Sequence, residues 1–132
     1  MGILDLFRKS KRPAARFLDG RVGYAVGDIH GRSDLLADMI ALLERRSADD
    51  TRLAGPPIVV FLGDYVDRGL DSAGAIELLA AGGPAHCERR CLRGNHEQSL
   101  MAFLDNPTAN RGWLLQGGAE TVMSYGVRPP PF

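Results

Sequence analysis

The chain has 132 residues, in which 16 lysines and arginines balance 16 aspartates and glutamates. This length allows one compact domain, and the balanced charge argues against a protein that coats nucleic acid or binds anionic membranes through its net field. Apolar residues make up 45% of the chain and charged residues 24%. These proportions are those of ordinary soluble globular proteins, so they exclude a mainly disordered chain.

The first twenty residues do not resemble a targeting segment. They are rich in basic side chains, and their one apolar run, at residues 3–7, is interrupted by Asp5. This pattern fits neither a signal peptide nor a membrane span, so we expect a cytoplasmic protein with no membrane partner and no nucleic-acid partner. We predict a loose basic lead-in at residues 1–20, one domain at residues 21–126 and a Pro-rich tail at residues 127–132.

Three times the chain repeats an extended run, a glycine-rich polar turn and a helix-like stretch, which is typical of an α/β fold with a mostly parallel sheet. The run at residues 58–62 is continuously apolar, as in a central strand that is covered on both faces. Charges interrupt the third run, which predicts an exposed edge strand. The expected strands cover residues 22–26, 58–62 and 87–92.

Helices are expected after each turn. Ser33 can cap the first, which should end near Arg46, and the second should begin at Ser72 and stop at a glycine pair. The third should follow Glu97 and end before residue 106, and a short helical pair should lie at residues 113–125.

The two cysteines do not predict a disulfide. Cys87 and Cys91 lie four residues apart in an expected strand, which places their Cα atoms roughly 13 Å apart and beyond disulfide reach. With His86 they make no recognisable zinc spacing. We therefore expect free thiols and a surface histidine.

The polar turns carry the candidate functional residues. They read GDIHG at residues 27–31, GDYVDRG at residues 63–69 and GNHE at residues 94–97. Because the carboxyl ends of parallel strands share one edge of a sheet, these turns should meet at one site. An extended exit from the first strand would point Asp28 and His30 to the same side.

These turns predict a metal centre built from Asp28, His30, Asp64 and Asn95. Their oxygen and nitrogen ligands suit Mn²⁺, Fe or Zn²⁺ better than a soft metal. Asp64 could bridge two ions, with Asp28 and His30 on one and Asn95 on the other. Two divalent ions roughly 3.5–4 Å apart would activate a shared water as hydroxide for in-line attack at phosphorus.

The same turns offer a proton donor and phosphate binders. His96 could protonate a leaving group if a carboxylate orients its ring, and Asp67 is the best candidate for that partner. Arg68 and Arg93 lie at the same rim, where a guanidinium matches the geometry of phosphate oxygens.

The three turns resemble the signature blocks of the calcineurin-like metallophosphoesterases, in the serine/threonine phosphoprotein phosphatase branch of small bacterial and phage members. The resemblance runs from about Tyr24 to Gly126 and includes Trp113, Gly117, Gly118, Thr121, Ser124 and Tyr125. It implies the first half of an α-β-β-α sandwich. It also implies two divalent metals, with Mn²⁺ as the expected metal, and a phosphoprotein or small phosphomonoester as the substrate. The metal, acid and phosphate roles given above are those that the resemblance implies.

Two other hypotheses stay open. The symmetrical bis(5′-nucleosyl)-tetraphosphatases resemble the first block, although that group usually lacks an aspartate equivalent to Asp67 and has aspartate in place of Glu97. Family members also continue into a second half with further histidine ligands, whereas this chain has only His30, His86 and His96. A truncated domain could instead be a metal-poor interaction module that self-associates through an uncovered sheet face.

Overall fold

A computed structural model describes residues 20–49 and 54–129 of the chain. The lead-in predicted at residues 1–20 therefore lies, apart from Gly20, outside the described residues, as do the last three residues of the predicted tail. None of the described helices is long and apolar enough to cross a membrane.

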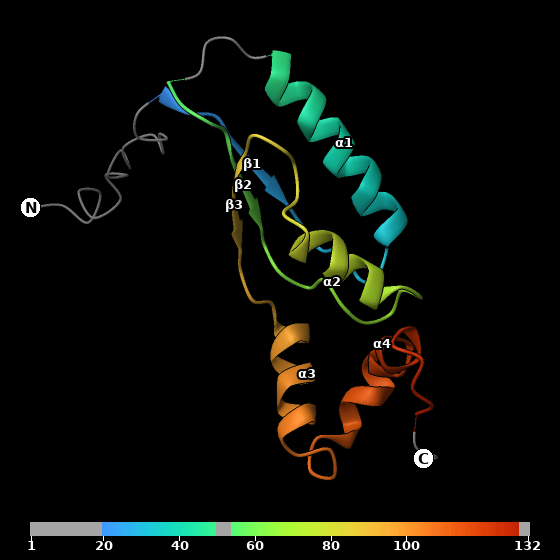
Figure 1. Cartoon of the computed structure of the whole chain (residues 1–132). Coiled ribbons are helices and arrows are strands. Elements are labelled where there is room, and N and C mark those ends of the chain that lie inside the picture. Colours follow the sequence, from blue (N-terminus) through green and yellow to red (C-terminus); the bar gives the residue numbers. More distant parts are fainter. Residues whose placement is uncertain (1–19, 50–53, 130–132) are drawn as a thin grey trace, which may run out of the picture.

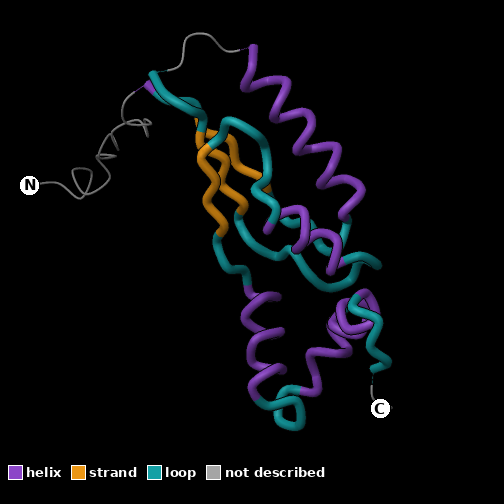
Figure 2. The backbone as a smooth tube through the Cα atoms, in the orientation of Figure 1, coloured by secondary structure: helices purple, strands orange, loops and turns teal. Residues whose placement is uncertain are grey.

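Strands and helices alternate along the chain, which confirms the predicted α/β class (Figure 1). The last three helical elements lie beyond the carboxyl ends of the strands (Figure 2). In chain order, the elements are β1 (Gly23–Val26), α1 (Ser33–Asp49), β2 (Ile58–Phe61), α2 (Ser72–Ala80), β3 (Glu88–Cys91), α3 (Asn95–Asp105), the 3₁₀ helix η3 (Arg111–Gln116) and α4 (Gly118–Ser124).

The three strands form one parallel sheet in the order β1-β2-β3. Val60 of β2 pairs with Ala25 on one side and with Arg90 on the other. The apolar run therefore occupies the centre of the sheet, as predicted, and the charged third run forms an edge. The sheet places the carboxyl ends of all three strands, and the turns that follow them, at one edge.

The core lies between the sheet and two helices. Val59 and Phe61 are fully buried and belong to one apolar cluster with Leu36 of α1 and Leu79 of α2. Both helices lie on the same side of the sheet (Figures 1 and 2). Side chains alternate along a strand, so the neighbours of these core residues on β2 face the other way.

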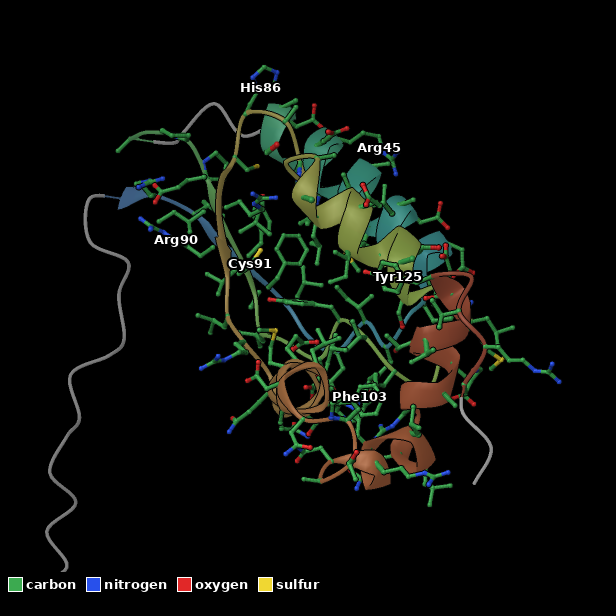
Figure 3. The ribbon with its side chains drawn as sticks, turned by 60° about the horizontal axis from the view of Figure 1, so that its bottom comes forward. Arg45, His86, Arg90, Cys91, Phe103 and Tyr125 are labelled. Carbon is green, nitrogen blue, oxygen red and sulfur yellow. The ribbon has the colours of Figure 1, made fainter. Side chains whose placement is uncertain are left out.

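The opposite face of the sheet has no helix over it within the part of the chain that the structure describes. Arg90 points to this face, whereas Cys91 points toward the core (Figure 3). Leu62 is 50% exposed and Leu92 51% exposed. An ion network covers part of the face: Glu88 accepts from Arg21 at 2.8 Å and from Arg90 at 2.5 Å, and these bonds hold its pKa below the usual range.

The structure corrects three details of the helix predictions. Helix α1 continues to Asp49 rather than ending near Arg46, and within its last turns the Ser47 hydroxyl donates to the Glu44 carbonyl at 3.0 Å. Ser33 is the first residue of α1 rather than the residue before it, and its hydroxyl donates to the Asp71 carboxylate. Helix α3 begins at Asn95, before Glu97, and the Glu97 carboxylate, three residues after the N-cap Gly94, accepts the Gly94 N–H.

The predictions for the two cysteines, for His86 and for the helical pair near the end of the chain are confirmed. Cys87 and Cys91 are free thiols, and His86 is exposed at the far end of the sheet from the site (Figure 3). The predicted helical pair near the end of the chain is present as η3 and α4, joined at Gly117.

Phe61, the last residue of β2, and Leu62, which follows it, provide a test of this packing. We expect Phe61→Ala to lower the free energy of unfolding by about 3–5 kcal/mol, because it leaves a cavity in the core. Leu62→Ala should cost less than about 1 kcal/mol, because that side chain is already half in water. Urea unfolding followed by circular dichroism measures both, and equal losses would contradict the one-sided core.

Candidate metal centre

The three polar turns meet at the carboxyl edge of the sheet. Ligand atoms of His30, Asp64 and His96, one from each turn, all lie within 4.8 Å of one another. The rings of His30 and His96 pack edge to face, with centroids 4.7 Å apart. Asp28 adds a fourth group, since its Oδ2 lies 3.8 Å from His30 Nε2.

Backbone hydrogen bonds hold the first turn against the second. The N–H groups of Ile29 and His30 donate to the Asp64 carbonyl at 3.0 and 2.9 Å. His30 and Asp64 have φ values of 45° and 54°, a left-handed conformation that non-glycine residues seldom adopt. The predicted extended exit through His30 is therefore wrong: a tight turn, rather than alternation along a strand, brings Asp28 and His30 together.

The closest approach between these turns requires a glycine. A Cβ at Gly69 would lie 2.0 Å from the carbonyl oxygen of His30, a backbone atom that cannot move aside. Gly69 thus lets the second turn lie directly against the first.

The Glu97 carboxylate connects the second turn to the third. It accepts the N–H groups of Gly94 and Asp64 at 2.8 Å, of Tyr65 at 2.7 Å and of Val66 at 3.3 Å. A charged acceptor binds such donors more strongly than a neutral one. The sequence prediction missed this role, because the N-cap is Gly94, which has no side chain, whereas a capping box is recognised from a serine or threonine at that position.

His30 presents the lone pair of Nε2 to the centre of the site. Its Nδ1 lies 3.0 Å from the carbonyl oxygen of Val66, which can only accept, so Nδ1 carries the proton and Nε2 does not. A neutral imidazole together with the Asp28 and Asp64 carboxylates is a donor set that divalent cations take up in proteins. The residues present therefore fit a metal ion.

His96 and Asp67 form the expected pair. His96 Nδ1 lies 2.7 Å from Asp67 Oδ2, and both residues are buried. The His96 N–H donates to Asp64 Oδ1 at 3.1 Å. The pair therefore sits directly beside the metal-ligating cluster, with His96 Nε2 directed into it.

Arg68 lies in the site as well. Its guanidinium bridges the two histidines, with Nη1 3.2 Å from His30 Nε2 and Nη2 3.3 Å from His96 Nε2. The backbone N–H of Arg68 donates to the Gly117 carbonyl at 3.0 Å, which fixes the point from which the side chain extends. The guanidinium thus places a positive charge where the two ring nitrogens converge.

Two of the predicted site residues, Asn95 and Arg93, are exposed. Asn95 is exposed at the start of α3, next to His96, so its backbone lies beside Asp64. Arg93 is exposed, and within the described residues its side chain makes no hydrogen bond or ion pair. The structure therefore gathers Asp28, His30, Asp64, Asp67, Arg68 and His96 and leaves Arg93 at the rim.

Comparison with known proteins agrees with this geometry. Residues 24–127 match the family described as calcineurin-like phosphoesterase. The chain is also similar to the uncharacterized protein F44B9.9 of Caenorhabditis elegans, with 33% identity over 108 residues. That match covers 76% of this chain and 40% of the relative, so the chain spans well under half the length of the curated relative it matches.

The bonds to Glu97 predict a shared loss of stability and metal affinity. Glu97→Gln should lower the free energy of unfolding by about 2 kcal/mol, because a neutral amide offers one acceptor oxygen in place of two charged ones. The same variant should bind Mn²⁺ more weakly, because Asp64 loses its backbone anchor. Gln98→Ala, on the exposed side of the same helix turn, is the control, and an equal effect there would contradict the anchoring role.

The position of Arg68 predicts competition with a metal ion. Arg68→Ala should raise the affinity for Mn²⁺ severalfold, because it removes a positive charge from beside both Nε2 atoms. Arg93→Ala, which removes an equal charge at the rim, should leave the affinity unchanged. Titration followed by the electron paramagnetic resonance of free Mn²⁺ measures both, and an unchanged affinity in Arg68→Ala would contradict the competition.

Proposed function

Because the chain belongs to the calcineurin-like phosphoesterase family, a family of metal-dependent phosphoesterases, we propose that it forms the metal- and phosphate-binding part of a phosphomonoester hydrolase of the serine/threonine protein phosphatase type. The observation that supports this most directly is the meeting of His30, Asp64 and His96 within 4.8 Å. A phosphoprotein or small phosphomonoester is the proposed substrate.

The proposed ligands form two sets that share one carboxylate. Asp28, His30 and Asp64 would hold one divalent ion, and Asp64 with Asn95 would hold the other. Mn²⁺ is the metal we propose, and Fe and Zn²⁺ also suit these ligands. When bound, the ions supply the Lewis acidity that activates water and stabilises charge at phosphorus.

His96 is the proposed proton donor to the leaving oxygen. Its Nδ1 proton is held by Asp67 at 2.7 Å, so Nε2 is the nitrogen that exchanges a proton with the substrate. The buried carboxylate orients the ring and stabilises it when both nitrogens carry protons. This division of roles needs no covalent bond between the chain and the phosphoryl group.

Arg68 is the proposed phosphate binder. Its guanidinium already lies within 3.3 Å of both site histidines, so a rotation of the side chain about its fixed backbone would turn the fork toward phosphate oxygens bound at the same place. Arg93 extends from the rim and would add charge there.

Two contacts favour the phosphatase branch over the nucleosyl-tetraphosphatases. Asp67, which that group usually lacks, is buried and bound to His96. Glu97, where that group has aspartate, reaches four backbone N–H groups from two turns. The side chain of an aspartate is one methylene shorter and would not span the same distance.

A non-catalytic interaction module is a second candidate. The half-exposed Leu62 and Leu92 on the uncovered sheet face favour it, because apolar side chains gathered on one face commonly mark a contact surface. Self-association through this face is compatible with either candidate.

Hydrolysis of a phosphoserine peptide, whose alkoxide leaving group must be protonated, by the purified chain with and without Mn²⁺ tests the proposal. We expect metal-dependent turnover that falls at least 100-fold in Asp64→Ala, which loses the shared ligand, and in His96→Ala, which loses the proton donor (on the order of 10²-fold for an acid catalyst). No turnover by a folded chain that sediments as a dimer or larger would favour the interaction module instead.

Metal affinity separates the two roles that His96 could have. Asp64→Ala should weaken Mn²⁺ binding, because it removes a ligand, whereas His96→Ala should leave it unchanged. A parallel loss of affinity in His96→Ala would make His96 a ligand and overturn its assignment as the acid.

A further inference from the structure

The Asp67 carboxylate is completely buried and is held by three donors. Its Oδ2 accepts from His96 Nδ1 and from Trp113 Nε1, each at 2.7 Å, and its Oδ1 accepts from the Thr121 hydroxyl at 2.7 Å. A carboxylate in an apolar interior is costly unless donors satisfy its oxygens. Trp113 and Thr121, which follow Asp67 by 46 and 54 residues, supply two of the three.

The directions of these bonds are fixed by chemistry. An indole nitrogen can only donate, so Asp67 Oδ2 accepts from Trp113 whatever else happens at the site. The Thr121 oxygen accepts the Asp67 N–H at 2.9 Å and lies 3.0 Å from the Ser72 hydroxyl, which leaves its own proton for Asp67 Oδ1. Asp67 is therefore held as an acceptor toward His96.

Packing fixes the Trp113 ring in turn. A Cβ at Gly118 would lie 2.4 Å from the ring atoms, so only glycine lets α4 approach the indole this closely. The Phe103 ring contacts it from α3, with centroids 4.8 Å apart, and extends from that helix toward the last elements of the chain (Figure 3). The indole N–H thus has one available direction, toward Asp67.

From this network we infer that Trp113 and Thr121 are positioning residues for proton transfer: they hold the Asp67 carboxylate and, through it, the ring of His96. The inference rests on the proposed function. Neither side chain acts on the phosphoryl group itself, and both act through Asp67. The elements η3 and α4, which carry Trp113 and Thr121, would therefore contribute to catalysis as well as to the fold.

Leaving-group dependence distinguishes positioning from general support of the fold. Trp113→Phe keeps an aromatic ring in place and removes the N–H. We expect kcat on a phosphoserine peptide, whose alkoxide must be protonated, to fall about tenfold. Turnover of p-nitrophenyl phosphate, whose phenolate leaves without a proton, should change little, and KM should stay the same for both.

Phe103→Leu is the matched control, because it disturbs the packing of the same indole without removing its N–H. It should leave the ratio of the two rates unchanged. An equal fall on both substrates in Trp113→Phe, or the same change of ratio in Phe103→Leu, would overturn the inference.

A second pair of variants at Thr121 makes the same test independently of the indole. Thr121→Val is nearly isosteric and removes the hydroxyl, so it should reproduce the selective loss on the phosphoserine peptide. Thr121→Ser restores the hydroxyl and should recover most of the rate. Loss of rate in both variants alike would show that the methyl packing matters and not the bond to Asp67.

A spectroscopic measurement tests the network whether or not the chain is catalytic. Trp113 is the single tryptophan of the chain, so its indole N–H gives one unambiguous signal in a ¹H–¹⁵N correlation spectrum. We expect this signal to exchange slowly with solvent and to shift in Asp67→Asn. If the wild-type chain shows no turnover, the proposed function fails, and an indole signal that exchanges freely and ignores Asp67→Asn would overturn the positioning role separately.

Discussion

The Glu97 carboxylate is the interaction on which the site depends. Four backbone N–H groups from two different turns converge on its two oxygens, so the second turn cannot shift relative to the start of α3. The carbonyl of Asp64, fixed in this way, then accepts the N–H groups of Ile29 and His30 in the first turn. Hydrogen bonds among the turns thus bring His30, Asp64 and His96 together.

Asp67 connects the site to η3 and α4, the last two helical elements of the described chain. Its buried carboxylate needs donors, and it finds them on η3 and α4 rather than on the sheet. These elements pack against α2 and α3 beyond the strand ends (Figure 2). Asp67 therefore serves both as the partner of His96 and as one of the contacts through which the last helices join the domain.

The sequence allowed the fold and the gathering of the turns to be predicted, because both follow from local pattern: an apolar run at residues 58–62 and a polar turn after each strand. The features that could not be predicted from the sequence depend on tertiary contacts. The left-handed turn at His30 reflects a bond to Asp64, and the role of Trp113 depends on a carboxylate 46 residues away. No spacing rule in a single sequence encodes such contacts.

The charges of the site explain how Arg68 can have two positions. Three carboxylates, those of Asp28, Asp64 and Asp67, lie within or beside the cluster, and the guanidinium between His30 Nε2 and His96 Nε2 offsets part of their charge. In the proposed function, divalent cations would take over that role and repel the guanidinium from the ring nitrogens. A phosphate dianion bound at the same place would attract it again, from the outer side. The same side chain would therefore stabilise the cluster before ligands bind and recognise the substrate afterwards, and its backbone bond to Gly117 lets it do both from one fixed point.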